Sequence, residues 1–370
     1  MAAVNYHAGE FPPAELDLER LLPLIGPANA ALARYEGLLH GVPNAQVLLS
    51  PLLSQEAVLS SKIEGTQATL GEVLEFEAGE EAVSGEKRDD IQEVINYRNA
   101  LRGAITRMNE LPLSQRLIRD AHRVLMEGVR GQDKTPGEYR RIGNYIAMAG
   151  QDIEQARFIP PDANKVPGLM SAWEKYLHSA APDKLVQLAI AHAEFEAIHP
   201  FLDGNGRIGR LLVPLFMVAK GLLSSPDFYI SAYLEVRRDE YYERLNAVSR
   251  KGDWTGWCVF FLTALTEQAM DNEEKAKAIL ALYQAKKDWI AETTRSQHAI
   301  RALDWFFSWP IFNASAFVDS AGIPKPTANR IVRVVRDEGM LRELRPSRGS
   351  RPAILCFPEL MNIAEGRRVF

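Results

Sequence analysis

The stretch that decides the fold reads His199-Pro-Phe-Leu-Asp-Gly-Asn-Gly-Arg-Ile-Gly-Arg210, and it lies between two strong helical patterns. Apolar residues recur every three or four positions over Asp183–Ile198 before it and over Arg207–Lys220 after it. Pro200 ends the first helix, because proline lacks the amide hydrogen that a helix interior needs. A glycine-rich turn then opens the second helix. The sequence therefore predicts two helices joined by a tight turn.

The residue types within this turn point to phosphate chemistry. A glycine-rich turn that leads into a helix exposes several backbone N–H groups in one concavity, where the helix dipole favours an anion. Arg207 and Arg210 are three positions apart and emerge on one face, so two guanidinium groups suit two phosphates. Asp203 offers an oxygen ligand for Mg²⁺, and His199 is suited to accept a proton near neutral pH. Together they predict a phosphoryl- or nucleotidyl-transfer site.

Taken singly, these residues have structural explanations. A lone histidine at a helix end is more often a cap or a hydrogen-bonded core group, and Gly-Asn-Gly alone is usually a turn. His192 and Glu196 are four apart on the preceding helix and imitate a metal pair, but no third ligand stands at a fitting spacing. We expect core packing or a structural hydrogen bond for that pair. Only the combined spacing favours a functional site.

This spacing resembles the signature of the Fic family, His-Pro-Phe-x-Asp/Glu-Gly-Asn-Gly-Arg-x-x-Arg, at all nine fixed positions. The resemblance implies a protein adenylyltransferase, a nucleotidyltransferase that uses ATP and Mg²⁺ to place AMP on Tyr, Ser or Thr hydroxyl groups of target proteins and of itself. His199 would be the general base, Phe201 would hold the loop in the core, and Asp203 would bind Mg²⁺. The resemblance implies that the phosphates are held by Gly204, Asn205, Gly206, Arg207, Gly209 and Arg210.

A second motif, Ser60-Ser-Lys-Ile-Glu-Gly65, closes the helical pattern of Leu52–Ile63. A carboxylate in a last helical turn faces the negative end of the dipole and is unfavourable unless a cation meets it. The motif resembles the inhibitory Ser/Thr-x-x-x-Glu-Gly/Asn sequence of one class of Fic proteins. That resemblance implies that Glu64 pairs with Arg210 and excludes the γ-phosphate of ATP from its productive position, with Ser60 and Gly65 as part of the motif. The alternative is a capping box formed by Ser61 and Glu64 at the start of a new helix.

Two further regions bear on how substrates are held. Strand-like Tyr145-Ile146 and Arg157-Phe158-Ile159 flank a turn-rich Ala149–Asp152, which predicts a β-hairpin. In position it corresponds to the flap of the family, which clamps a target segment by β-augmentation. Similar proteins build the adenine and ribose pocket from residues that correspond here to Tyr233, Glu235, Tyr241 and Tyr242. Of these, Tyr242 is our candidate for stacking on the base.

The chain as a whole is predicted to be mainly α: a Fic-fold helical core with a small β-hairpin flap, plus a C-terminal winged helix-turn-helix. We expect an N-terminal helical region with the inhibitory motif over 1–95, a catalytic core over 96–255, a helical connector over 256–297 and the winged helix over 298–370. The remaining helical patterns cover Ala28–Leu39, Asp89–Asn109, Ser114–Met126, Val166–His178, Asp239–Val248, Trp254–Leu265 and Asn272–Trp289.

The last 70 residues or so carry a pattern of their own. A helix is expected over Ala299–Phe307, a helix-turn-helix over Asn313–Glu338, and short strands at Leu341–Leu344 and Ala353–Phe357 around a basic loop. Winged helices bind either DNA or protein, so both stay open as partners. The arginines that would face DNA are Arg330, Arg333, Arg336, Arg345, Arg348 and Arg351.

Charge supports a separate C-terminal module. The net charge is −5 over 370 residues, yet His298–Phe370 holds eleven Lys/Arg against seven Asp/Glu, while the remainder is acidic. A basic module favours a nucleic-acid or acidic partner. An alternative function is therefore a DNA-binding regulator whose Fic-like core only senses nucleotide. A Fic-type site could also remove AMP from a protein or transfer another phosphate-containing group.

Cysteine use and hydropathy address location. Cys258 and Cys356 lie far apart and lack metal-type spacing, which suits a reducing compartment. The first ten residues show no signal-peptide pattern, and the longest apolar stretch, Leu211–Ala219, is too short to cross a bilayer. We expect a cytoplasmic protein without a membrane partner, and a homodimer stays open.

Overall fold

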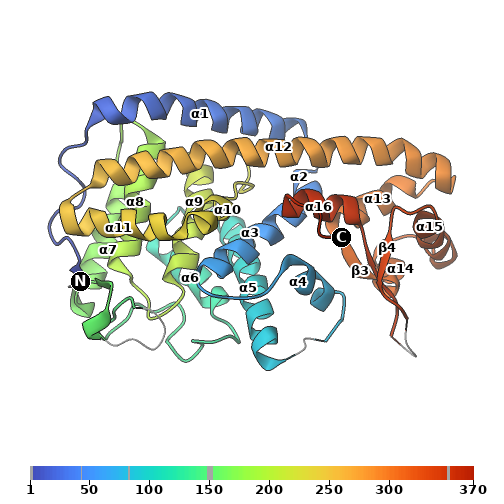
Figure 1. Cartoon of the computed structure of the whole chain (residues 1–370), viewed down its shortest axis with the longest axis horizontal. Coiled ribbons are helices and arrows are strands. Elements are labelled where there is room, and N and C mark those ends of the chain that lie inside the picture. Colours follow the sequence, from blue (N-terminus) through green and yellow to red (C-terminus); the bar gives the residue numbers. More distant parts are fainter. Residues whose placement is uncertain (1–2, 43, 82–83, 148–152, 348–350) are drawn as a thin grey trace. The chain divides into compact units, whose positions relative to one another are not determined.

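The computed structural model describes residues 3–42, 44–81, 84–147, 153–347 and 351–370, and it is mainly α with a few short strands (Figure 1). The chain forms two compact units. Unit 1 comprises Met1–Glu36, Leu59–Gly65 and Asn96–Met270, and unit 2 comprises Gly37–Val58, Thr66–Ile95 and Asp271–Phe370. The division into four consecutive domains stays a prediction. Helices with residues in both units are α1 (Leu18–Gly41), α3 (Ser50–Ile63), α5 (Gly85–Met108) and α12 (Trp254–Thr294).

Unit 1 is built around a central helix, α8 (Lys184–Ile198), with thirteen of its fifteen residues buried. Because α8 is apolar nearly all round, it must be covered on every side. It packs against α7 (Val166–His178), the helix before it in the chain, and against α9 (Asn205–Ala219), the helix after it (Figure 1). The other helices of the unit are α6 (Gln115–Leu125), α10 (Ser231–Val236), α11 (Arg238–Lys251) and the 3₁₀ turns η1 (Ile153–Gln155) and η2 (Ala163–Lys165).

The predicted starts of two of these helices are confirmed. Ser114 and Asp183 are N-caps whose side chains accept hydrogen bonds from backbone amides of the first turn. Two buried tryptophans then fix α8: the indole of Trp173 donates to the Ala191 carbonyl at 2.8 Å and that of Trp257 donates to the Ala189 carbonyl at 2.7 Å. The helix that leads into the loop is thus held rigidly from two sides.

The segment of the expected flap differs from a simple hairpin. Ile146 forms one antiparallel bridge with Phe158, whereas β2 (Phe158–Ile159) pairs in parallel with the N-terminal strand β1 (Val4–Asn5). The predicted turn at Ala149–Asp152 lies outside the described residues. The sequence did not indicate β1, because a two-residue strand shows no periodicity.

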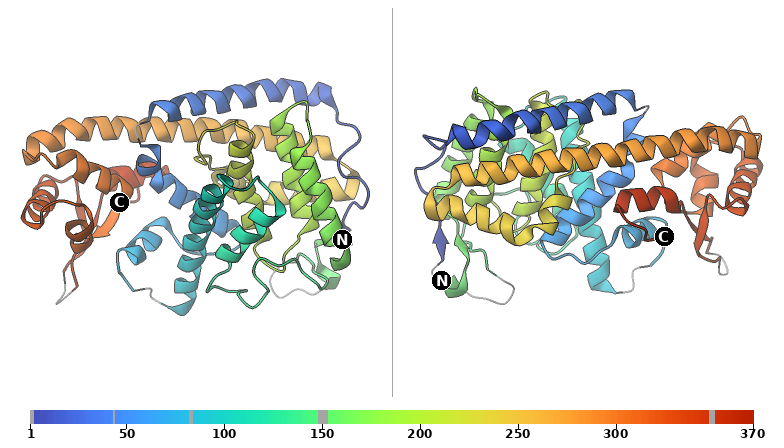
Figure 2. Two further views of the ribbon diagram at one scale, coloured as in Figure 1. Left: turned by 180° about the vertical axis from the view of Figure 1, so that it is seen from behind. Right: turned by 45° about the horizontal axis from the view of Figure 1, so that its top comes forward.

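One expectation for the helices shared by the two units is wrong. We predicted separate helices over Trp254–Leu265 and Asn272–Trp289, but α12 is a single helix of 41 residues. Thr266–Asp271 contains neither glycine nor proline, so nothing in it stops helix propagation. The first turns of α12 run beside the N-terminal half of α1 in both views of Figure 2, and the Asp17 amide donates to the Thr255 hydroxyl at 3.0 Å.

Unit 2 contains a three-stranded antiparallel sheet in the order β3-β5-β4. The elements before it are α2 (Ala45–Leu48) and α4 (Leu70–Glu77); α4 is capped by a box formed by Thr69 and Glu72. The remaining elements in chain order are α13 (Ala299–Ser308), β3 (Ile311–Asn313), α14 (Ala314–Ser320), α15 (Lys325–Asp337), β4 (Arg342–Arg345), β5 (Ile354–Cys356) and α16 (Pro358–Glu365).

The helices and the two strands predicted for residues 298–370 are all present, whereas β3 and α16 were missed there and α4 was missed earlier in the chain. Its core is aromatic, since Phe306 stacks on Phe312 and Phe317 with ring centroids 5.5 and 4.8 Å apart. Asn313 caps α14 and also donates to the Ala78 carbonyl at 2.8 Å. Across the described residues, no helix combines the length and apolar character needed to span a membrane.

Candidate active site

The loop after α8 begins with a reversal of the backbone. His199 caps α8 in the left-handed region, with φ 48° and ψ 62°, and its N–H still donates to the Phe195 carbonyl at 3.1 Å. Such a conformation is uncommon for a residue other than glycine and must be held by its surroundings. Phe201 supplies part of that hold, because it is fully buried and stacks on His122 with centroids 3.8 Å apart and ring planes 5° apart.

Asn205 closes the loop on itself. Its side-chain oxygen accepts the Phe201 N–H at 2.8 Å, and its side-chain NH₂ donates to the Phe201 carbonyl at 2.9 Å. Both ends of the buried amide are therefore occupied. As the first residue of α9, Asn205 has a backbone N–H that finds no partner inside the helix.

Two residues that the sequence did not single out complete the support of the loop. The guanidinium of Arg140 donates to the His199 carbonyl at 2.9 Å and to the Ile198 carbonyl at 3.3 Å, while its backbone N–H donates to the Pro200 carbonyl at 2.9 Å. These contacts satisfy carbonyls that the end of α8 leaves without helical partners. An arginine far from the motif in sequence carries no signal of this role.

His122 is the second of these residues. Its Nδ1 accepts the Gly137 N–H at 2.8 Å, so the proton must sit on Nε2, which donates to the Asp203 carbonyl at 3.0 Å. Burial lowers the pKa of His122 to about 4, with the charges of Arg207 and Arg123 acting in the same direction. The ring is therefore neutral, and its two hydrogen bonds and its stacking on Phe201 hold the loop in position.

The glycines of the motif are explained by close approaches. Gly204 has φ +73°, and a Cβ there would lie 2.9 Å from the Met126 sulfur. A Cβ on Gly206 would lie 2.1 Å from a carboxylate oxygen of Glu64. Side chains at these positions are excluded because other groups contact the backbone of the first turn of α9 directly. This is the turn whose N–H groups were predicted to bind phosphate.

Arg210 and Glu64 form the central ion pair of the site. Arg210 is fully buried; its Nη2 donates to Glu64 at 2.7 Å and to the Ser60 carbonyl at 2.9 Å, and its Nε donates to the Ser60 hydroxyl at 2.9 Å. Burial would raise the pKa of Glu64, but the Arg210 guanidinium outweighs it and holds that pKa below its usual value. The capping-box alternative is wrong, because α3 ends at Ile63 and no helix starts at Ser61.

Asp203 and Arg207 form the rim. Asp203 lies 2.9 Å from the Lys134 ammonium and 3.6 Å from the Arg207 guanidinium. Burial would raise the pKa of Asp203, but the hydrogen bond from Lys134 and the charge of Arg207 hold it low, so the carboxylate is ionised. The described residues contain no group of three or more His, Cys, Asp or Glu side chains that could hold a metal ion. A metal at Asp203 would need its other oxygen ligands from a substrate or water.

His199 presents one nitrogen for chemistry. Its Nδ1 lies 3.3 Å from the Glu196 carbonyl, which can only accept, so Nδ1 carries the proton and Nε2 is the basic atom. Burial lowers the pKa of His199 to about 4, and the Arg140 charge adds to the effect. At neutral pH the imidazole is uncharged and able to accept a proton.

Comparison with known proteins now decides the family. Residues 22–106 match the Fic/DOC family N-terminal model, and residues 112–217, which include the whole loop, match the Fic/DOC family model. The chain belongs to the Fic/DOC family. Its Fic motif therefore occupies the α8–α9 connection of a helical core, as the sequence predicted.

Individual relatives agree with this assignment. The protein adenylyltransferase Fic of Drosophila ananassae is 27% identical over 215 residues, which cover 56% of this chain and 39% of that relative. The chain thus spans about two fifths of the curated relatives' length. Among solved structures, a Fic family protein from Desulfovibrio desulfuricans G20 superposes with a TM-score of 0.60 at 21% identity, covering 94% of this chain and 98% of the other. A Fic domain containing signaling protein from Bacteroides thetaiotaomicron gives 0.52 at 18%, covering 69% and 98%.

The residues expected to line the adenine pocket of this Fic core fall into two groups. Tyr241 is fully buried and Tyr233 nearly so, which makes both of them core residues. Tyr242 is partly exposed, and its pKa is raised to about 12 by burial and by the nearby Glu64. Glu235 pairs with Lys62 at 2.8 Å. Tyr242 and Glu235 are thus the members of the set that a ligand can reach.

In the described part of the chain, His192 and Glu196 do not belong to any group of three or more potential metal ligands. His192 is fully buried between the Gly209 carbonyl, 3.0 Å from Nδ1, and the Tyr241 hydroxyl, 2.9 Å from Nε2. The expected structural hydrogen bonds are therefore confirmed. Glu196 has an oxygen that would lie 2.1 Å from a Cβ on Gly209, so this third glycine of the Fic motif also admits a carboxylate to the helix backbone.

Proposed function

We propose that the chain is a protein adenylyltransferase that transfers AMP from ATP to Tyr, Ser or Thr hydroxyl groups of target proteins and of itself, and that Glu64 restrains it. The observation that carries this proposal is the state of Arg210. A fully buried guanidinium in a Fic motif is held by a carboxylate from a different segment of the chain. An anion-binding arginine that already has an anion is the arrangement expected of an inhibited phosphate site. The naming of the Drosophila relatives as adenylyltransferases supports the transferred group.

In this proposal the phosphates of ATP lie over the first turn of α9. The backbone N–H groups of Asn205 and Gly206 would hold the α- and β-phosphates, because the helix dipole favours anions at this first turn. The Gly204 N–H now donates to the Asp203 carboxylate at 2.7 Å and would join them once released from it. Arg207 would contact the β-phosphate, and Gly209 lets the Glu196 carboxyl group approach the helix backbone one turn further on. Arg210 takes the γ-phosphate once Glu64 has withdrawn from it.

Asp203 would hold Mg²⁺, since it is an ionised carboxylate at the rim whose present partner, Lys134, sits on a long and exposed side chain. A metal held there would supply positive charge to offset that of the phosphates. The remaining ligands would be phosphate oxygens and water. Glu235 and Tyr242 would contact the ribose and the adenine.

The transfer step uses His199. Its Nε2 accepts the proton of the target hydroxyl while that oxygen attacks the α-phosphorus. A new O–P bond forms, the bond between the α-phosphorus and its bridging oxygen breaks, and pyrophosphate leaves. Arg140 keeps the imidazole in place through the His199 carbonyl. The target segment would be presented at the strand edge around Ile146, where main-chain pairing selects for an extended peptide rather than for particular side chains.

Glu64→Gly tests the restraint. Incorporation of labelled AMP from ATP and Mg²⁺ should rise well above wild type, because Arg210 becomes available to the γ-phosphate. Glu110→Gly, which removes an exposed glutamate just beyond α5, is the matched control and should not change labelling. Labelling of Glu64→Gly no higher than wild type would remove the inhibitory role.

His199→Ala tests the base. In the Glu64→Gly background it should abolish labelling and leave ATP binding largely intact. Mass spectrometry of the products separates the possible reactions, since adenylylation adds AMP, phosphorylation adds phosphate, and reversal of the reaction removes AMP from a modified protein.

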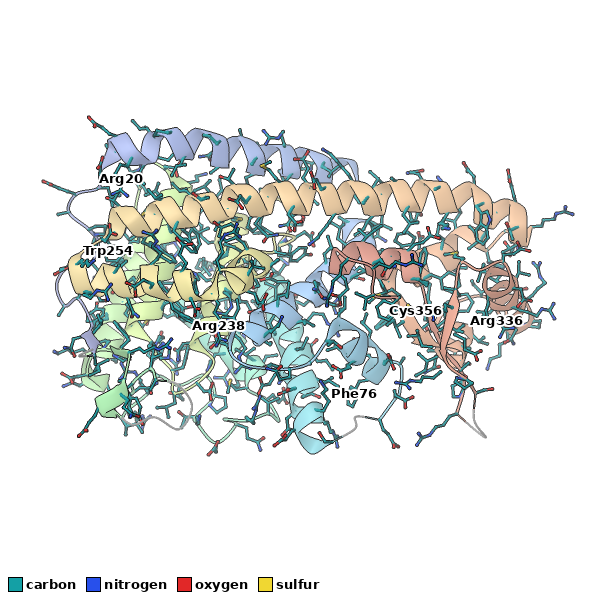
Figure 3. All side chains as sticks on the ribbon, viewed as in Figure 1. Arg20, Phe76, Arg238, Trp254, Arg336 and Cys356 are labelled. Carbon is teal, nitrogen blue, oxygen red and sulfur yellow. The ribbon has the colours of Figure 1, made fainter. Side chains whose placement is uncertain are left out.

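A second candidate function is DNA binding by residues 298–370 as a winged helix-turn-helix. Arg333 and Arg336 are exposed on α15, and Arg336 can be followed in Figure 3. Not every predicted arginine is available: Arg345 pairs with Glu75 at 3.3 Å and Arg351 with Glu81 at 2.8 Å.

Arg330 also has a protein partner, because it donates to the Thr294 carbonyl at 2.7 Å, and Arg348 lies outside the described residues. The proposal therefore rests on α15 rather than on the basic loop. A gel-shift assay over a range of salt concentrations tests it, and an absence of salt-sensitive binding would refute it.

A further inference from the structure

Two buried polar atoms of opposite charge type lie unpaired beside the loop. Within the described residues, neither Nη1 of Arg210 nor Oε1 of Glu196 has a hydrogen-bond partner. Glu196 stands on the last turn of α8, with its carboxyl group against the backbone of Gly209. The nearest basic nitrogen recorded for it is that of His192, at 3.9 Å. An ionised carboxylate in such a place would be costly, so its protonation state needs an explanation.

The hydrogen bonds around His192 fix where the protons lie. Nδ1 of His192 faces the Gly209 carbonyl, which can only accept, so Nδ1 carries a proton. In the neutral ring Nε2 must then accept, and the Tyr241 hydroxyl 2.9 Å away donates to it. The Tyr241 hydroxyl has a single proton, which forms the hydrogen bond to Nε2 of His192.

The Tyr241 proton is therefore directed to His192 and away from Glu196. The basic nitrogen recorded near the Glu196 carboxyl group belongs to the neutral His192 ring, and the buried Oε1 of Glu196 has no hydrogen-bond partner within the described residues. An ionised carboxylate in this place would lack a partner for its charge, so the geometry favours the neutral acid.

The charges that face Glu196 agree with a neutral acid. Burial raises the pKa of Glu196 to about 7 and the charge of Glu64 adds to this, while Arg210 and Tyr241 act in the opposite direction. Burial lowers the pKa of His192 to about 3, and the charge of Arg210 acts in the same direction, so the ring is uncharged. From α11, Tyr242 also faces this cluster, and its own pKa is raised to about 12, so it carries no charge.

We propose that Glu196 is a positioning residue for Arg210, which acts by remaining a neutral carboxylic acid and so leaves the buried guanidinium to one anion at a time. That anion is Glu64 in the resting protein. In the active protein it is the terminal phosphate of ATP, and this part alone rests on the proposed function. Ionisation of Glu196 would place a second carboxylate near Arg210 and weaken its hold on the phosphate.

An infrared titration tests the protonation state without nucleotide or activity. Wild type should show the carbonyl band of a buried carboxylic acid at pH 6, and the band should disappear as the pH rises above neutral. Glu196→Gln should lack this titrating band, whereas Glu110→Gln should retain it. A spectrum that is identical in wild type and Glu196→Gln would overturn the proposal, because Glu196 would then be ionised throughout.

ATP affinity gives the second test. The dissociation constant is measured from pH 5.5 to 8.5 for Glu64→Gly and for Glu64→Gly/Glu196→Gln. The two should agree at the acid end, and at pH 8.5 Glu64→Gly should bind ATP about tenfold more weakly than the double variant, the factor of a one-unit change in interaction. Loss of the Glu64 charge should also lower the pH at which Glu196 ionises, compared with wild type, because that charge raises the pKa of Glu196.

The outcomes separate the two proposals. Parallel pH profiles would overturn the role of Glu196 even if ATP binds well. A role in folding alone would change affinity equally at every pH. No ATP binding in any variant would instead count against the proposed function, and the infrared result would still decide the protonation of Glu196. A Glu196→Gln protein that fails to fold leaves the wild-type titration, repeated by NMR with ¹³C-labelled glutamate, as the deciding measurement.

Discussion

Two pairs of arginines with the same spacing behave in opposite ways. Arg207 and Arg210 are three apart on α9 and are 4% and 0% exposed, whereas Arg333 and Arg336 are three apart on α15 and both lie at the surface. The cause is the rest of each helix. α15 keeps its buried residues on one face, so its arginines occupy the other face. α9 buries twelve of its fifteen residues, so no polar face exists for arginines to occupy.

The difference shows what burial demands of a charge. An arginine at the surface needs no partner, and an ion pair there contributes little. A buried arginine must be matched by an anion and by hydrogen bonds, which is why Arg210 has Glu64 and Ser60. The requirement for an anion also makes the site selective for one when Glu64 is absent. Changes of pH and single substitutions test this difference between buried and exposed charges.

The largest effect should come from pH. His122, His192 and His199 have folded pKa values of about 4, 3 and 4, all below the ordinary value of 6.5. The unfolded chain therefore binds protons first, so their contribution to stability is complete above pH 6.5 and is lost as the pH falls toward 4. Between pH 7 and pH 5 the free energy of unfolding should fall by on the order of 4 kcal/mol.

Urea titrations at a series of pH values measure this loss. His122→Asn, which cannot titrate, should flatten the dependence between pH 6.5 and 4. An unchanged slope in that variant would show that His122 is not buried as a neutral ring.

The second largest effect on stability should come from removing the buried charge of Arg210. Arg210→Met should reduce the free energy of unfolding by about 3 kcal/mol, because it leaves Glu64 without its cation and Ser60 without its donors. Arg336→Met, the matched change on α15, should cost less than about 0.5 kcal/mol. Equal midpoints for the two variants in urea would contradict the contrast between the buried and the exposed arginines.

Two glycines separate backbone strain from crowding. Gly204 and Gly221 both have positive φ, +73° and +65°, but only Gly204 has neighbours that a Cβ would meet. Gly221→Ala should cost about 1 kcal/mol from strain alone. Gly204→Ala should cost about 1 to 3 kcal/mol more, because Met126 and Leu125 must move. Thermal unfolding of the two variants measures the difference, and similar costs would mean that the loop is loosely packed.

The smallest effect on stability is expected at Arg333. Arg333→Ala should leave the unfolding free energy within about 0.5 kcal/mol of wild type. If residues 298–370 bind DNA, the same change should lower the salt dependence of binding by about one unit of slope. If the variant is stable and its DNA affinity and salt slope are unchanged, Arg333 on α15 does not contact DNA.

The sequence predicted the residues of the site itself, but it did not predict the residues that hold the loop in place. The twelve-residue motif and Glu64 could be found because each lies in a short stretch whose residue types match a family signature at fixed spacing. Arg140 and His122 act from distant segments through backbone carbonyls, and such contacts leave no pattern in the residues that make them. Short elements were missed for a related reason: β1 and β3 have two and three residues, too few for any period.

The same limit explains the errors in helix length and pocket composition. Residues 266–271, four of them polar, lay between the two predicted helices, but polarity without glycine or proline does not end a helix. Tyr241 and Tyr242 are adjacent and look equivalent in sequence, yet one is buried against His192 and the other is partly exposed. Only the packing of α11 on α8 distinguishes them.

The paired hydrogen bonds between Asn205 and Phe201 have a thermodynamic consequence. Because the loop is already locked in shape before any nucleotide arrives, little conformational entropy is left to lose on association. Calorimetric titration of the Glu64→Gly protein with nucleotide should therefore show a small ordering penalty. Asn205→Ala should enlarge that penalty, because it removes both hydrogen bonds that hold the loop through Phe201.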